Sequence, residues 1–135
     1  MQKAGLPPPE NACAEGNWSS NSAESAFTQL LDAYPRMDAV FAGNDQMALT
    51  VLQIAHRCGL RVPWDLAVIG FDNMAESPYF WPALSTINHS LYELGCRAVQ
   101  ETVEQIEAVR RDEKLEPQNI LLSPELIVRE SSVIR

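Results

Sequence analysis

The chain has 135 residues, which is enough for about one domain, and apolar side chains make up 46% of it, so it can build a hydrophobic core. Its formal net charge of −8 excludes DNA binding by this chain alone, because an acidic surface repels phosphate. No apolar run is long enough to cross a membrane, and the N-terminus lacks the apolar stretch of a signal peptide. We therefore expect either a cytoplasmic protein or a piece whose targeting segment is absent.

The N-terminal part of the chain begins with a stiff proline run. Residues 1–10 are predicted to be an incoming linker, and residues 11–16 a short strand. Cap-forming side chains at residues 18–22 predict a helix that starts there, with apolar residues at helical spacing, and Pro35 is expected to end it.

Two short apolar runs then flank a second helix. Residues 38–42 and 66–71 are each bounded by turn-forming residues, which is typical of buried parallel strands. Between them, apolar residues from Met47 to Ala55 predict a helix that Cys58-Gly59 closes with a glycine cap. Asp45 is expected to be the N-cap of this helix.

The C-terminal part begins with a short aromatic segment at residues 76–81. Residues 85–89 are predicted to be extended, and an apolar stripe predicts a long helix over residues 91–109. Two last strands are expected at residues 120–122 and 126–128.

The alternation of strands and helices predicts an α/β fold, with a parallel sheet and helices on both faces. Ligands of such sheets bind outside the carboxyl ends of the strands. The loops expected at that edge carry one tryptophan, two amides and two carboxylates. These residues are Trp18, Asn44, Asp45, Asp72 and Asn73.

The three cysteines are predicted to be reduced and mostly buried. Cys13, Cys58 and Cys96 are odd in number and far apart, and none belongs to a CxxC pair. With His56 and His89 as the only histidines, a zinc site has few ligands to draw on. We expect no metal and no cofactor.

Five local strings, in order, resemble the lactose-repressor family of transcription regulators from about Trp18 onward. They are VFAGNDQMAL at 40–49, GLRVPWD at 59–65, VIGFDN at 68–73, PALSTI at 82–87 and PELIVRES at 124–131. The resemblance implies the second lobe of a two-lobed clamp like the type I periplasmic binding proteins. The family's DNA-binding head and first lobe would be missing, so the fold would be truncated.

The resemblance also implies a division of the chain. Residues 11–88 would form the second lobe. Residues 89–117 would cross over and supply a helix that packs on the missing first lobe, and residues 118–135 would return as strands to the second lobe. The segment from Thr86 to His89 would act as the hinge.

Four residues are expected to bind the effector. In the family, the aspartate at Asp72 hydrogen-bonds the effector, an aromatic side chain at Trp18 stacks on it, and Asn44 and His89 hold polar contact positions. From the residues alone, Asp72 also suits an Asx-turn and Trp18 a core position.

The family's dimer interface would contain Met47, Leu49, Tyr79 and Phe80, giving a homodimer. Ordinary core packing is the alternative for some of these side chains.

The function implied is sensing of a small molecule, expected to be a sugar, by a transcription repressor. An effector between two lobes would change their angle, and DNA would be bound only through the missing head. We expect no enzyme activity and no membrane partner. The second lobe of a periplasmic sugar-binding protein is the first alternative. A doubly wound α/β enzyme is the second, although the chain lacks GxGxxG, GxxxxGK[ST] and GxSxG strings.

Overall fold

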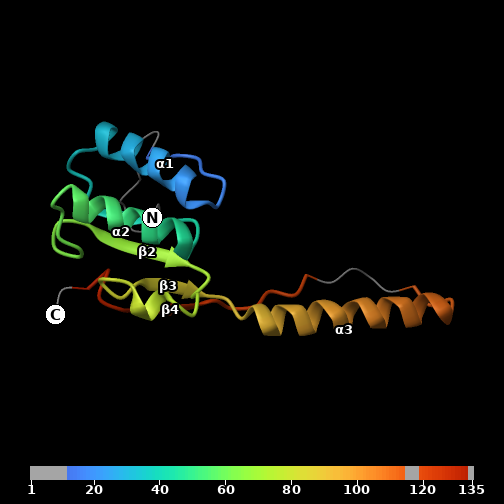
Figure 1. The fold of residues 1–135 in the computed structure, drawn as a ribbon. Coiled ribbons are helices and arrows are strands. Elements are labelled where there is room, and N and C mark those ends of the chain that lie inside the picture. The colour runs from blue at the N-terminus through green and yellow to red at the C-terminus, as the bar shows by residue number, and fades with distance from the viewer. Residues whose placement is uncertain (1–11, 115–118, 134–135) are drawn as a thin grey trace, which may run out of the picture. The chain divides into compact units, whose positions relative to one another are not determined.

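The computed structural model of the chain describes residues 12–114 and 119–133 (Figure 1). The chain divides into two compact units, of which the first combines residues 1–87 with residues 126–135 and the second spans residues 88–125. The linker predicted at residues 1–10 lies outside the described residues.

The first unit is built on a four-stranded sheet. Its strands, in spatial order, are β1 (Ala39–Phe41), β2 (Ala67–Phe71), β3 (Ser85–Asn88) and β4 (Glu125–Ile127). Val40 pairs with Val68, and Gly70 pairs with Thr86, both in parallel register. Parallel neighbours joined through helices confirm the predicted α/β class.

Two helices of the first unit start and end where the sequence predicts. In α1 (Ser20–Ala33), the Ser19 side chain accepts a hydrogen bond from the Ser22 amide, and the helix stops just before Pro35. Helix α2 (Asp45–Arg57) ends at Cys58, followed by Gly59 with φ +74°. That left-handed conformation is the one in which glycine ends a helix without a steric penalty.

The prediction that Asp45 caps α2 is wrong. The cap is the preceding residue, Asn44, whose Oδ1 accepts from the Met47 amide at 2.8 Å. Asp45 is the first helical residue and is 0% exposed. Because Asn44 already satisfies the helix end, the Asp45 carboxyl group is free to bind other segments.

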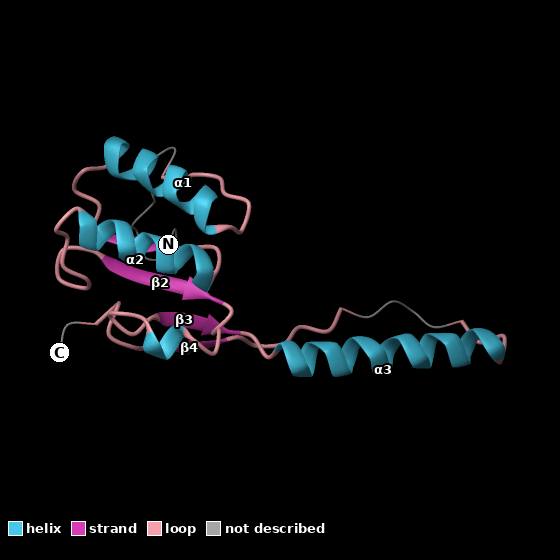
Figure 2. Cartoon of the chain, viewed as in Figure 1, coloured by secondary structure: helices cyan, strands magenta, loops and turns pink. Residues whose placement is uncertain are grey.

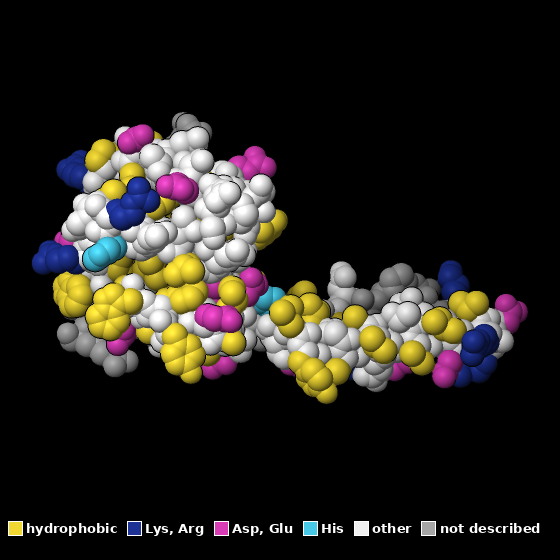
Figure 3. Space-filling model, in the orientation of Figure 1, with side chains coloured by type: hydrophobic (Ala, Val, Ile, Leu, Met, Phe, Trp, Pro, Cys, Tyr) yellow, Lys and Arg dark blue, Asp and Glu magenta, His cyan; other side chains and the backbone are white. Residues whose placement is uncertain are grey.

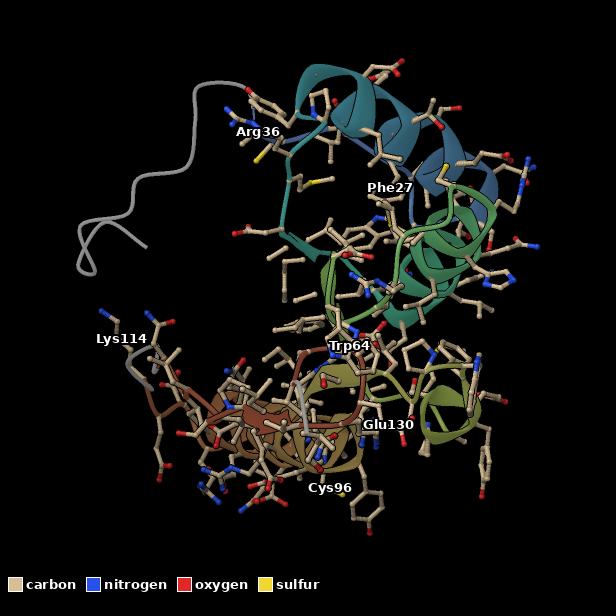
Figure 4. The ribbon with its side chains drawn as sticks, turned by 90° about the vertical axis from the view of Figure 1, so that its left-hand side faces the viewer. Phe27, Arg36, Trp64, Cys96, Lys114 and Glu130 are labelled. Carbon is tan, nitrogen blue, oxygen red and sulfur yellow. The ribbon has the colours of Figure 1, made fainter. Side chains whose placement is uncertain are left out.

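The core lies between the two helices and the sheet. Helix α1 packs on α2, α2 packs on β2, and Phe27 of α1 is buried in the cluster they share (Figure 4). Burial alternates along β2, with Val68 and Gly70 buried and their neighbours half-buried.

In β1, Phe41 is 60% exposed, so the prediction of a fully buried strand is wrong there. The reason is that β1 has a neighbouring strand on one side only among the described strands.

Two further expectations about strands fail. Residues 12–16 and 120–122 form no strand, and residue 11 lies outside the described part of the chain. A strand needs a neighbouring strand for its N–H and C=O groups, and hydrophobic character alone supplies none. The cysteines are free, but all three are exposed rather than buried.

The loop before β2 is closed by Arg61 and Asp65. The backbone N–H and Nε of Arg61 donate to Asp65 Oδ2 at 2.8 and 2.7 Å, and its Nη2 donates to Oδ1 at 2.7 Å. These hydrogen bonds lower the pKa of the Asp65 carboxyl from 3.8 to about 2, because they favour its charged form. The GLRVPWD string thus closes a loop.

The last described residues are built into the sheet. The Ser131 N–H donates to Ala83 O at 3.0 Å, and Ser131 O accepts from the Val68 N–H at 2.8 Å, so its backbone joins β2 to the segment before β3. Its side chain adds two bonds, donating to Val68 O at 2.6 Å and accepting from the Ser85 N–H at 2.8 Å. Ser131 is 0% exposed, so it is a buried residue that bonds β2 to the start of β3. We call this set of hydrogen bonds the Ser131 bracket.

The second unit contains one long helix, α3 (Leu91–Arg110), at the predicted position (Figure 2). The side chain of Ser90 caps it by accepting from the Glu93 amide. Hydrophobic side chains show along its surface (Figure 3), and Ala108 is its only buried residue. The large apolar side chains that are exposed are Leu91, Tyr92, Leu94, Val99, Val103, Ile106 and Val109.

Replacing Ser131 by alanine should destabilise the first unit, because it leaves the Ser85 N–H and the Val68 C=O without that side-chain partner. We expect a loss of about 1–3 kcal/mol in the free energy of unfolding, measured by urea denaturation. Ser25→Ala, at an exposed position of α1, is the matched control and should change it little. Equal stability of the two variants would contradict the bracket role.

Asp65→Asn should destabilise the chain slightly at neutral pH, and this difference should shrink as the pH falls from 3.8 and disappear only below the folded pKa of about 2. A carboxyl whose folded pKa is depressed stabilises the fold above its unfolded pKa, and that contribution is lost as the pH falls through the folded value of about 2. Carbon NMR titration of Asp65 in the parent chain measures the pKa directly. A midpoint near 4 would show that Arg61 does not hold the carboxylate in solution.

Candidate functional site

Three loops of the first unit surround a hollow of about 600 Å³. Trp18 precedes α1, Gly43 and Asn44 join β1 to α2, and Asp72 follows β2. The hollow is lined by Trp18, Phe41, Gly43, Asn44, Phe71 and Asp72. Of the five residues predicted at this edge, Trp18, Asn44 and Asp72 come together on the hollow. Asp45 and Asn73 do not line it.

Trp18 presents a broad aromatic face at this hollow. It is 67% exposed, and its backbone adopts φ 69°, a left-handed conformation that is uncommon for a large side chain. A Cβ placed on Gly43 would lie 3.4 Å from Cζ3 of the Trp18 ring, so the absence of a side chain at Gly43 keeps space beside the indole.

Asn44 connects the helix end to the Trp18 loop. While its Oδ1 caps α2, its Nδ2 donates to the Trp18 carbonyl oxygen at 3.1 Å. The amide thus fixes the loop that carries the indole. One Nδ2 hydrogen and one Oδ1 lone pair remain for further hydrogen bonds.

Two phenylalanines that the sequence did not predict as site residues complete the wall of the hollow. The rings of Phe41 and Phe71 meet edge to face, with centroids 6.5 Å apart and planes at 83°. Each is the last residue of its strand, next to a loop already assigned to the site. That strand-end position is the signal that would have found them.

Asp72 contributes the only ionisable group among the six lining residues. Its N–H donates to Ile87 O at 3.0 Å, and its φ of 108° is followed by a φ of 53° at Asn73. Two consecutive non-glycine residues with positive φ are strained, and strain of this kind gathers at functional sites.

The other predicted residues occupy different environments. His89 belongs to the second unit and stays a predicted effector contact. Met47 and Phe80 pack against the core, whereas Leu49 is 43% and Tyr79 86% exposed. Trp64 and Trp81, which were not predicted as surface residues, are also exposed.

This arrangement suits the binding of a small polar molecule that has apolar faces. Aromatic rings offer apolar surface, while a carboxylate and an amide give directional hydrogen bonds. Among the described residues, no group of three or more His, Cys, Asp and Glu could hold a metal ion. No described helix is both long enough and apolar enough to span a bilayer.

Comparison with known proteins gives the same fold and relatives that are transcription regulators. The family described as periplasmic binding protein-like domain matches residues 1–132. A helix-turn-helix-type transcriptional repressor named PurR, from Escherichia fergusonii, is 40% identical over 131 residues. This match covers 97% of the chain and 37% of that repressor, so the chain spans well under half the length of such curated relatives.

Solved structures agree. The transcriptional regulator CelR in complex with cellobiose superposes with a TM-score of 0.89 at 31% identity, covering 97% of this chain and 39% of that one. The lac repressor dimer bound to operator and to the anti-inducer ONPF gives a TM-score of 0.73 at 30% identity, covering 89% of this chain and 40% of that one.

The chain belongs to the periplasmic binding protein-like domain family, and the relatives and solved structures named above, which it resembles, are transcription regulators.

Asn44→Asp should separate the two roles of the asparagine. The variant keeps an oxygen that caps α2 but loses the amide that donates to Trp18 O, so the melting temperature should hardly change while the indole gains motion. Fluorescence anisotropy and acrylamide quenching of Trp18 measure this in a Trp64→Phe/Trp81→Phe background. Asn44→Ala, which also removes the cap, should cost a further 0.5–2 kcal/mol or so. Unchanged quenching in both variants would show that the hydrogen bond from Asn44 to Trp18 O does not restrain the indole.

Proposed function

We propose that this chain is the effector-sensing part of a bacterial transcription repressor and that its effector is a sugar. The observation that carries the proposal is the placement of the Trp18 indole and the Asp72 carboxylate on one hollow beside the amide of Asn44. A carboxylate accepts hydrogen bonds from two neighbouring hydroxyls, and an indole face covers the C–H groups of a sugar ring. The cellobiose complex of the similar regulator supports a saccharide.

The mechanism proposed is a change in lobe geometry. In it, residues 11–88 form the second lobe of a clamp, residues 89–117 cross to the first lobe, and residues 118–135 return to the second. Effector bound between the lobes would alter their angle about the segment from Thr86 to His89, with His89 as a further contact. In a dimer, this changes the spacing of two DNA-binding heads and hence the operator affinity. The function is regulatory rather than enzymatic, and the repressor acts in the cytoplasm.

The dimer is proposed to form through the start of α2 and the aromatic segment after β2. Leu49 and Tyr79 offer exposed apolar surface there, and Met47 and Phe80 support it from the core. The described surface of the first unit shows large apolar side chains (Figure 3), which suits a contact between two copies. The dimeric lac repressor structure supports this assembly.

A thermal-shift screen tests the proposed site. The chain is heated with cellobiose, glucose, galactose, ribose and adenosine, each over a range of concentrations. A compound at a hundredfold excess over its Kd should stabilise the parent by about 2.7 kcal/mol, which raises the melting temperature by several degrees. Asp72→Asn and Trp18→Leu should abolish that rise.

Two control variants sharpen this screen. Trp64→Leu removes an exposed tryptophan that does not line the hollow and should leave the response intact. Trp18→Phe keeps an aromatic face and should retain part of it. A compound that stabilises all four variants equally would show that it binds elsewhere, and a response to adenosine alone would replace the sugar by a nucleoside.

A further inference from the structure

We propose that Asp45 and Arg129 are positioning residues of the effector site, which hold the strained loop from Asp72 to Met74 so that Asp72 faces the hollow. Neither residue lines the hollow itself. The proposal rests on the proposed function in one respect only, namely that Asp72 is the residue whose position matters.

The loop needs to be held because its backbone is unfavourable. Asp72 and Asn73 adopt φ values of 108° and 53°, a region that L-residues other than glycine seldom occupy. Left alone, such a loop would relax toward negative φ and turn the Asp72 side chain elsewhere. Strained conformations persist only where the surrounding structure fixes them.

Asp45 fixes the loop from the side of α2. Its Oδ2 accepts from the Met74 N–H at 2.9 Å and from the Ser77 hydroxyl at 2.5 Å. Its Oδ1 accepts from the Thr86 hydroxyl at 2.6 Å, and Thr86 Oγ1 in turn accepts from the Asn73 N–H at 3.3 Å. Through these bonds, one fully buried carboxyl group holds two consecutive amides of the loop.

The chain makes room for this carboxyl group at Gly70. A Cβ at Gly70 would collide with Oδ1 of Asp45 and lie 3.0 Å from Cδ2 of Leu84. The glycine of the VIGFDN string therefore lets the aspartate of the VFAGNDQMAL string approach β2. Helix capping does not explain Asp45, because Asn44 supplies the cap.

Arg129 holds the same loop from the C-terminal segment. Its Nη2 donates to Asn73 Oδ1 at 2.8 Å, and its Nη1 donates to Leu84 O at 2.7 Å. Its own N–H donates to Ser85 Oγ at 2.7 Å, which fixes the base of the side chain. The guanidinium thus ties the residue after Asp72 to the sheet, independently of Asp45.

The test is NMR on the full ¹⁵N-labelled chain without any ligand. Its result therefore does not depend on whether the thermal-shift screen finds a compound that binds. Amide hydrogen exchange at Asn73 and Met74 reports whether the loop is held, and the three-bond HN–Hα couplings of Asp72 and Asn73 report their φ values. The variants are Asp45→Asn and Arg129→Gln. The matched controls are Asp32→Asn and Arg57→Gln, which change exposed residues of α1 and α2.

We expect exchange at the loop amides to rise at least tenfold in both variants, with couplings moving toward conformationally averaged values. Amides in the middle of α1 and β2 should keep their protection, as should the loop amides in both controls. A merely structural role would instead raise exchange evenly over the first unit, and that result would overturn the proposal. Unchanged loop amides and couplings would overturn it too. If Asp45→Asn does not fold, Arg129→Gln alone decides, because Arg129 contacts the loop from the other side.

Discussion

The geometry of the candidate site depends on one buried group, the carboxyl of Asp45. A buried carboxyl without partners would be costly, so the native arrangement must bring hydrogen-bond donors to it. Those donors come from the loop after β2, from the short 3-10 helix η2 (Ser77–Tyr79) and from β3. A single requirement for satisfied hydrogen bonds thus assembles three segments around the N-terminal end of α2.

Three strings of the sequence are explained by this assembly. The neighbouring residues Asn44 and Asp45 have different roles: Asn44 caps the helix and bonds to Trp18 O, while Asp45 accepts a hydrogen bond from the loop after β2. Gly70 supplies the space that the Asp45 carboxyl group occupies, and the C-terminal Arg129 grips the same loop. Together these contacts fix the positions of an aromatic face and a carboxylate on one hollow. Because both groups are already ordered, a ligand that binds there would pay less conformational entropy.

The sequence was most informative where the signal is local. Helix ends depend on nearby cap residues, so α1, α2 and α3 could be placed, and strand-end loops could be assigned to one edge of the sheet. It failed where the outcome depends on distant neighbours. Phe41 is exposed because β1 has a neighbouring strand on one side only among the described strands, residues 120–122 form no strand, and the role of Asp45 depends on residues 29 to 41 positions away. No propensity of an isolated segment encodes such contacts.

The bracket formed by Ser131 has a consequence for biosynthesis. Residue 131 bonds to residues 68, 83 and 85, so the seam between β2 and the segment before β3 stays open on any nascent chain that has not yet reached it. Until then, β2 and β3 still pair directly, but the N–H and C=O of Val68, the C=O of Ala83 and the N–H of Ser85 lack these partners at the start of the two strands. The first unit therefore completes these hydrogen bonds only after residue 131 has been translated, so its sheet becomes fully bonded late in synthesis.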